Sequence, residues 1–160
     1  MIVCQFGVMF FPDKAKAFAE VARVLCPDGL FVFTAWDTLD TSDLPAAVVA
    51  GLAEMFTDDP PSFLTRIPHS YHEADRIRRD VAAGGLAVES IDRIVLRGAA
   101  PSARVIAEGF CYGTPLRFEL QERGDVEQLT DELAERMTVQ LGAGPVEGEL
   151  AAYLILARRP

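Results

Sequence analysis

Two histidines, His69 and His72, are the residues of this chain best suited to acid–base chemistry. An imidazole titrates near neutral pH, so either ring could take a proton from a hydroxyl group of a substrate. Their close spacing would also suit a metal ion, but the surrounding sequence offers no third ligand, and we predict no metal site. The structural alternative is that both rings belong to the start of a helix. We assign His69 to a predicted substrate pocket and predict no catalytic residue.

Trp36 and Asp37 form a second candidate pair, at the end of a strongly apolar stretch. A tryptophan is large, and its indole N–H needs a partner when the ring is buried, which suits the wall of a ligand pocket. We therefore place Trp36 in the same predicted substrate pocket. Asp37 could act as a general base, although capping the following loop is the simpler role for it.

The stretch that positions this pair is a strand–helix–strand unit over residues 1–37. The run 2–6 is apolar except for Gln5 and is continuous rather than alternating, which predicts a first strand buried on both faces. A helix is expected from Asp13 to about residue 25, ended by Pro-Asp-Gly. The run 30–36 predicts a second strand at the centre of a sheet, parallel to the first.

Beyond residue 37 the pattern changes from strands to helices. A helix expected from about 45 to 56 is apolar on most faces, and we interpret about 38–70 as a lid insertion that caps the end of the second strand. Ser70 and Glu73 have capping-box spacing before the next helix. The later predicted elements are a helix over 71–83, a strand over 86–96, a short helix over 102–110, an amphipathic helix over 125–141 and a final strand over 150–157.

Composition limits the possible classes of protein. The chain has 160 residues, half of them hydrophobic, which fits one globular domain. Its formal net charge is −9, and phosphate binding requires clustered Lys and Arg, so we expect no nucleic-acid partner and no anionic membrane surface.

Cysteine usage and hydropathy predict the compartment. Cys4, Cys26 and Cys111 are too few and too widely spaced for a disulfide framework, and we expect buried free thiols in a reducing environment. No basic segment precedes the apolar N-terminal run, and no apolar run has the roughly 20 residues of a membrane helix. We expect a cytoplasmic protein.

Several of these stretches resemble the class I S-adenosylmethionine-dependent methyltransferases. Residues 4–13, CQFGVMFFPD, are similar to the loop after the fourth strand, called motif IV in that family. Residues 20–29, EVARVLCPDG, resemble the helix and the Leu-x-Pro-Gly-Gly turn before the fifth strand, with Asp28 where the first glycine is commoner. Residues 71–86 resemble the last helix of the family and its Gly-Gly-Leu end.

The resemblance implies an α/β fold whose complete sheet has the strand order 3-2-1-4-5-7-6, with strand seven antiparallel. This chain would correspond to strands four to seven, an incomplete Rossmann-like sheet. We expect one C-terminal methyltransferase-like domain over 1–160, with the lid insertion inside it.

The resemblance also implies a cofactor, S-adenosylmethionine, at the carboxyl ends of the strands. The expected cofactor-binding residues lie at the carboxyl end of the first strand; they are Cys4, Gln5 and Phe6. The expected substrate-pocket residues of the following loop are Val8, Met9 and Phe10, in addition to Trp36 and His69. Two alternatives stay open: Gln5 could only tie the loop to neighbouring backbone, and the aromatic and aliphatic side chains could be ordinary core.

The function expected from the resemblance is methyl transfer to a small, lipophilic molecule. The sequence contains no Gly-x-Gly-x-x-Gly loop to hold the cofactor, so we expect the chain as given not to bind S-adenosylmethionine in the usual way. The alternative is a non-catalytic small-molecule-binding or oligomerisation module derived from a methyltransferase. The first strand would leave an apolar sheet edge, which predicts a two-fold homodimer through that strand.

Overall fold

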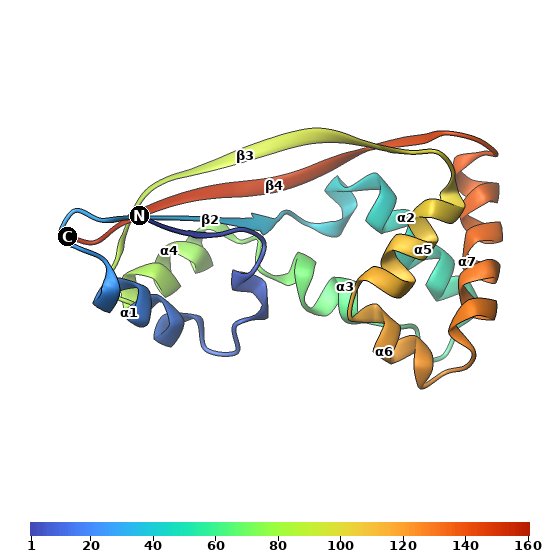
Figure 1. Ribbon diagram of the computed structural model, residues 1–160, viewed down its shortest axis with the longest axis horizontal. Coiled ribbons are helices and arrows are strands. Elements are labelled where there is room, and N and C mark those ends of the chain that lie inside the picture. Colours follow the sequence, from blue (N-terminus) through green and yellow to red (C-terminus); the bar gives the residue numbers. More distant parts are fainter. The chain divides into compact units, whose positions relative to one another are not determined.

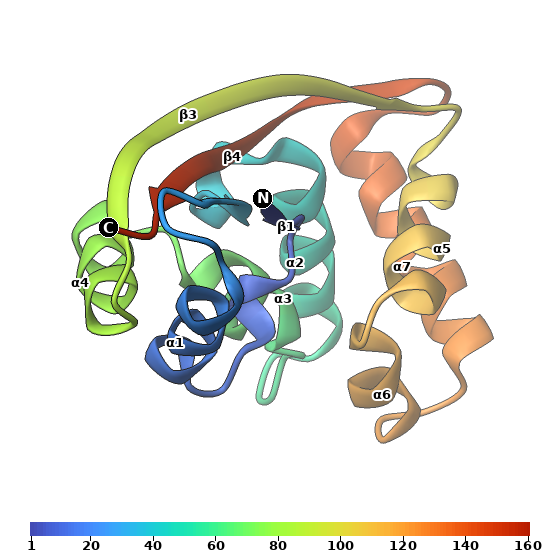
Figure 2. The same cartoon turned by 60° about the vertical axis from the view of Figure 1, so that its left-hand side comes forward.

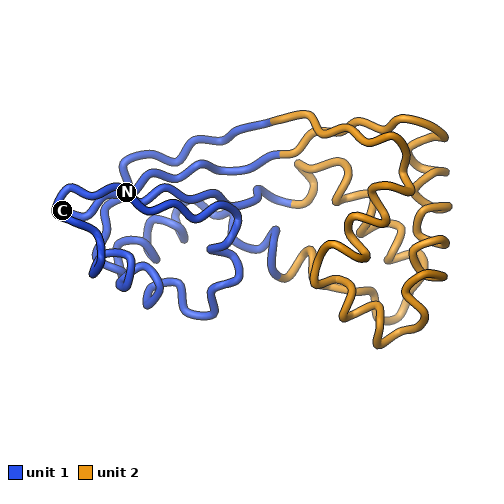
Figure 3. Tube along the Cα trace, in the orientation of Figure 1, with its two compact units in different colours: residues 1–38, 67–95, 151–160 blue, residues 39–66, 96–150 orange.

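A computed structural model describes all 160 residues, which divide into two compact units (Figure 3). Unit 1 comprises Met1–Thr38, Ile67–Val95 and Ala151–Pro160, and unit 2 comprises Leu39–Arg66 and Leu96–Leu150. Residues 39–66 of the expected lid thus share a unit with 96–150. The assignment of one domain with a lid insertion over 38–70 stays a prediction.

The strands form one mixed sheet with the order β1-β2-β4-β3 (Figure 1). The strands are β1 (Ile2–Cys4), β2 (Leu30–Trp36), β3 (Ala87–Ala100) and β4 (Val146–Arg158). β1 pairs parallel with β2, and β4 pairs antiparallel with β2. This confirms the order expected for strands four to seven, including the antiparallel last strand. β2 has the predicted bounds, whereas β3 and β4 are longer than predicted.

The prediction that the first strand is buried on both faces is wrong. β1 is only three residues long and lies at the edge of the sheet, and the side chain of Val3 is 60% exposed. Ile2 and Cys4 are partly buried and pack against the core of unit 1. A continuous apolar run therefore does not establish two covered faces, because coverage depends on what lies on each side of the strand.

Two helices cover the same side of the sheet in unit 1, α1 (Lys14–Val24) and α4 (Ala74–Ala83) (Figure 2). Asp13 caps α1, since its carboxylate accepts a hydrogen bond from the Lys16 amide at 2.9 Å. Phe18 of α1 is fully buried against Phe31 and Phe33 of β2, with ring centroids 5.9 and 5.5 Å away. These contacts hold the strand that ends at Trp36.

The predicted capping box of the next helix does not form. α4 begins at Ala74, after the cap residue Glu73, which makes no side-chain cap hydrogen bond. Ser70 instead lies in the 3-10 turn η3 (Pro68–Ser70), and its hydroxyl donates to the Ile67 carbonyl. The hydroxyl is therefore satisfied inside the turn and does not reach the helix.

Unit 2 is helical outside the ends of β3 and β4. Its elements are η2 (Leu39–Thr41), α2 (Asp43–Met55), α3 (Phe63–Arg66), α5 (Ala103–Gly113), α6 (Leu116–Gln121) and α7 (Val126–Leu141). The predicted helices over 45–56, 102–110 and 125–141 are confirmed as α2, α5 and α7, whereas α6 was missed. A Cβ atom on Gly51 of α2 would lie 2.7 Å from Leu133 Cδ1 of α7, so a larger residue there would require the Leu133 side chain to move.

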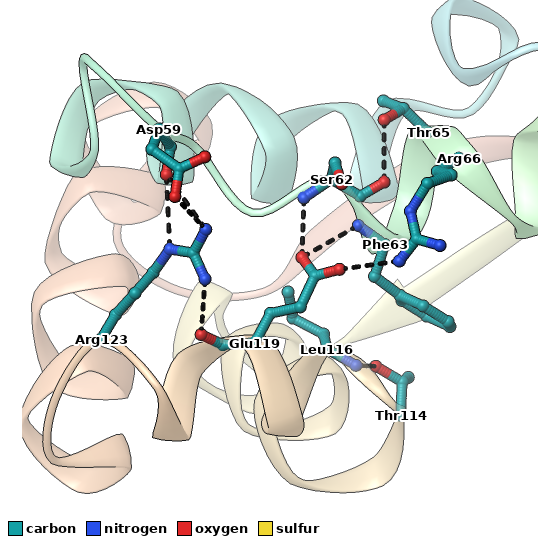
Figure 4. A network of polar contacts seen from close by, with 9 residues as sticks. All are labelled: Asp59, Ser62, Phe63, Thr65, Arg66, Thr114, Leu116, Glu119 and Arg123. Atoms are coloured by element: carbon teal, nitrogen blue, oxygen red, sulfur yellow. Dashed lines mark hydrogen bonds and ion pairs between the residues drawn. The ribbon is translucent and has the colours of Figure 1, made fainter.

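A polar network joins α3 to α6 (Figure 4). Glu119 of α6 accepts hydrogen bonds from the amides of Ser62 and Phe63, at 2.7 and 3.2 Å, and pairs with Arg66 at 3.1 Å. Arg123 pairs with Asp59 at 2.6 Å. The Glu119 carboxylate thus satisfies the free amides at the start of a four-residue helix.

The expectation of three buried thiols is only partly right. Cys111 is buried, Cys4 is half-buried and Cys26 is exposed, and all three are free. Cys26 is exposed because it lies in the turn between α1 and β2, outside the helices and strands that form the core. None of the helices combines the length and the hydropathy needed to cross a membrane.

Candidate functional site

The loop after β1 folds back onto the end of β2. Phe6 has a left-handed backbone conformation, with φ of 49°, and its amide donates to Thr34 Oγ1 at 2.9 Å. Its ring stacks on Trp36, with centroids 4.0 Å apart and planes inclined by 13°. The structure therefore brings together two residues from different parts of the predicted site as a stacked aromatic pair.

The other two predicted cofactor contacts differ in their surroundings. Gln5 is exposed, and its side chain makes no hydrogen bond within the chain, so it does not tie the loop to neighbouring backbone. Cys4 is half-buried, and a Cβ atom on Gly7 would lie 2.8 Å from its sulfur. Gln5 is thus available to a ligand at the carboxyl end of β1. Cofactor binding by Cys4, Gln5 and Phe6 stays a prediction.

The next residues form the 3-10 turn η1 (Val8–Phe10). Val8 and Met9 lie in the core of unit 1, whereas Phe10 is 47% exposed. The ammonium of Lys14 donates to the Phe11 carbonyl at 3.0 Å and holds the end of this turn. Burial, and then the charge of Arg76, lower the pKa of Lys14. A pocket role for Val8, Met9 and Phe10 stays a prediction.

Asp37 is almost fully buried, at 4% exposure, and both of its carboxylate oxygens are occupied. Oδ1 accepts the Thr38 amide at 2.8 Å, and Oδ2 accepts Arg93 Nε at 2.6 Å. Burial alone would raise the pKa of Asp37, but the hydrogen bonds from Arg93, Thr38 and the Tyr153 hydroxyl outweigh it and lower the pKa below its usual range. Asp37 is therefore an ionised structural anchor and a poor general base.

Arg93 and Tyr153 were not among the predicted site residues. Arg93 lies on β3 and Tyr153 on β4, 56 and 116 residues after Asp37 in the sequence. The residues next to Arg93 and Tyr153 in the sequence give no sign that either side chain bonds to Asp37. The pairing of β2 with β4, in which Ala35 faces Tyr153, brings Tyr153 to Asp37, and β3, which neighbours β4 in the sheet, brings Arg93.

His69 lies in η3 and is 6% exposed. Its Nδ1 is 2.8 Å from the Asp37 carbonyl oxygen, and because a carbonyl can only accept, Nδ1 carries the proton. The Trp36 ring lies 6.2 Å away, centroid to centroid. Burial, and to a lesser extent the charge of His72, lower the pKa of His69.

His72 bonds in the same way, with its Nδ1 2.9 Å from the His69 carbonyl oxygen. No group of three or more His, Cys, Asp or Glu side chains is placed to hold a metal ion. Unit 1 therefore carries, at the end of β2, an aromatic stack, a neutral imidazole and an ionised carboxylate held by an arginine. This arrangement could bind an aromatic or aliphatic ligand and accept a proton from it.

The first 33 residues match the family model of a methyltransferase domain. They contain β1, the Cys4–Phe6 loop, η1, α1 and the start of β2. A search of curated protein sequences finds no match.

Solved structures give the comparison over the whole chain. A proposed methyltransferase from Bacillus halodurans C-125 has 15% identity and a TM-score of 0.51, with 99% of this chain and 63% of that one covered. The YcgJ protein from Bacillus subtilis has 20% identity and a TM-score of 0.48, with 99% and 62% covered. A phosphoethanolamine N-methyltransferase 2 from Haemonchus contortus, in complex with phosphomonomethylethanolamine and S-adenosylhomocysteine, has 13% identity and a TM-score of 0.44, with 99% and 33% covered.

The likeness to the Bacillus halodurans structure shows the fold. The last two TM-scores are too low to indicate a shared fold by themselves, and this chain spans less than two thirds of each of these structures. The family match at residues 1–33, the strand order and the likeness to the Bacillus halodurans structure confirm the resemblance to class I S-adenosylmethionine-dependent methyltransferases. The chain has the partial α/β sheet of that class.

Proposed function

We propose that this chain forms the acceptor side of an S-adenosylmethionine-dependent methyltransferase that acts on a small, lipophilic molecule. The observation that carries the proposal is the strand order β1-β2-β4-β3 with an antiparallel β4, on a chain whose first 33 residues match a methyltransferase domain. The Phe6–Trp36 stack supports an apolar acceptor. Methyl transfer requires mainly that donor and acceptor are positioned and kept from water, which an apolar site provides.

The cofactor fits the residues present only in part. The free side chain of Gln5 and the loop around Phe6 would contact its methionine end, but the chain has no glycine-rich loop for the rest. When bound, S-adenosylmethionine supplies the methyl group. We propose that the 160-residue chain by itself binds this cofactor weakly.

A fluorescence titration tests this function, because Trp36 is the single tryptophan of the chain. We expect lipophilic small molecules to change Trp36 emission, and S-adenosylhomocysteine to bind more weakly than the low-micromolar range. Gln5→Ala should weaken the response to S-adenosylhomocysteine further, and Gln121→Ala, at an exposed position of α6, should not. Saturable low-micromolar binding would contradict the expected loss of cofactor binding, and no response to any ligand would contradict the function.

The sheet edge favours a second candidate, an oligomerisation module. β1 pairs with a strand on one side only, and its Val3 side chain is exposed. An apolar edge strand is a template for pairing with another chain, so we propose a two-fold homodimer through β1. Light scattering should give twice the mass of the chain; a monodisperse monomer would contradict the dimer without affecting the methyltransferase assignment.

A further inference from the structure

We infer that His69 is the general base of this site and that the acceptor is an aromatic molecule with an acidic hydroxyl group, a phenol or an enol. The inference rests on the proposed methyltransferase function and names the acceptor chemistry. Its evidence is the geometry of one ring and its neighbours in unit 1.

The first step is the position of the proton on His69. Nδ1–H donates to the Asp37 carbonyl oxygen at 2.8 Å, which leaves the lone pair of the neutral ring on Nε2. Nε2 accepts no hydrogen bond within the chain, and it is accessible to solvent. The imidazole is thus fixed in the tautomer that a base needs, with its basic nitrogen unoccupied.

The second step is the charge state of the ring. The groups around His69 are the Asp37 carboxylate, which Arg93 and Tyr153 hold, and the imidazole of His72. The turn η1, which packs on η3, carries no charged side chain. Burial lowers the pKa of His69, so the ring is neutral at neutral pH and able to accept a proton.

The third step is the class of acceptor. A base with a lowered pKa is weak, so it deprotonates only hydroxyl groups that are themselves acidic, such as a phenol with a pKa of about 10. Phe6 and Trp36 stack on each other beside His69, and both rings are only half-buried, so an aromatic acceptor can pack against this pair. The ring and the base therefore select the same kind of molecule.

The chemical step that His69 performs is one proton transfer. The O–H bond of the acceptor breaks, its electron pair stays on oxygen, and the proton forms an N–H bond at His69 Nε2. The result is an imidazolium facing a phenolate or enolate oxygen. The charge of Asp37, whose carbonyl already holds the ring, favours the imidazolium.

The test uses 4-nitrophenol, whose phenolate absorbs visible light and whose neutral form does not. The matched ligand 4-nitroanisole carries a methyl group in place of the acidic proton. Binding is followed by Trp36 emission, and ionisation by the visible absorption of the bound ligand. With the unmodified chain we expect bound 4-nitrophenol to ionise at a lower pH than the free compound.

The variant His69→Gln should remove this downward shift and weaken 4-nitrophenol binding about tenfold, with 4-nitroanisole unaffected. His72→Gln is the matched control, because His72 makes the same Nδ1 contact to a backbone carbonyl but is not paired with Trp36. It should keep both the affinity and the downward shift, because the charge of His72 lowers the pKa of His69 and its removal can only favour proton transfer to His69. If His69→Gln does not fold, ¹⁵N spectra of the unmodified chain replace it: binding of 4-nitrophenol, and not of 4-nitroanisole, should protonate Nε2 of His69.

Three results would overturn the inference. If bound 4-nitrophenol ionises at the same pH in His69→Gln and in the unmodified chain, His69 is not the base. Equal binding of 4-nitrophenol and 4-nitroanisole would show that the site does not select an acidic hydroxyl group. The proposed lipophilic acceptor site would remain. No binding of either ligand would overturn both this inference and the proposed acceptor site.

Discussion

At the scale of single residues, the buried carboxylate of Asp37 ties the end of β2 to a neighbouring strand. Its Oδ2 accepts Arg93 Nε of β3, and its Oδ1 accepts the amide of Thr38. Arg93 lies 56 residues further along the chain, so the pair depends on the folding of the sheet.

Replacement of Asp37 by Asn should destabilise unit 1, because Arg93 loses its charged partner. We expect the free energy of unfolding to fall by about 2 kcal/mol in urea denaturation at neutral pH. Asp40→Asn, at an exposed position, should change it little. Equal stability of Asp37→Asn and the unmodified chain would show that the pair contributes nothing.

The effect of Asp37→Asn should also depend on pH. The pKa of Asp37 is below its ordinary value of 3.8 in the folded chain, so the carboxylate contributes its full stabilisation above that value. The contribution is lost as the pH falls through the folded-state pKa. The difference in unfolding free energy between the two proteins should therefore shrink in acid; a difference that grows there would contradict the assignment.

At the scale of elements, the close approach of α4 to α1 depends on Gly84. A Cβ atom at this position would lie 2.4 Å from Phe18 Cβ and 2.9 Å from the Phe18 carbonyl carbon. Gly84→Ala should therefore destabilise the chain by about 1–3 kcal/mol, measured by thermal or chemical unfolding.

Gly109 provides the matched control with the opposite sign. It lies inside α5, and a Cβ atom there would meet no atom within 4 Å. Gly109→Ala should therefore stabilise the chain by about 0.5–1 kcal/mol, because alanine is the better helix former. Destabilisation by Gly109→Ala would contradict the open surroundings of this position.

The contact of α6 with α3 depends on Glu119. Glu119→Gln removes the charge that binds Arg66 and the two amides, and should lower the local stability of residues 62–66 by about 1 kcal/mol. Hydrogen exchange of the Ser62 and Phe63 amides measures this directly. Glu122→Gln, at an exposed position of the same region, should leave their exchange unchanged; faster exchange in both variants would argue against a specific role of Glu119.

At the scale of the whole molecule, the prediction concerns assembly. Val3→Lys places a charge on the exposed edge of β1 and should shift the proposed homodimer toward monomer in light scattering. Val24→Lys changes an equally apolar and exposed residue, 56% exposed on α1, and should leave the mass unchanged. A dimer that survives Val3→Lys would place its interface away from β1.

The sequence by itself determined those elements whose signal is local. β2, α1 and α7 were predicted within a few residues, since an apolar run, a Pro-Asp helix start and a helical stripe are each read from neighbouring positions. The order and direction of the strands came from the resemblance, which the structure confirms.

Only the tertiary structure decided the rest. The exposure of Val3 and Cys26, the capture of Ser70 within its turn and the bond of Arg93 to Asp37 all depend on groups distant in sequence. The same holds for the stack of Phe6 on Trp36 and for the tautomer of His69, which a backbone carbonyl 32 residues away fixes. Local patterns state what a residue prefers, whereas its partners follow from how β2, β3, β4 and η3 come together in unit 1.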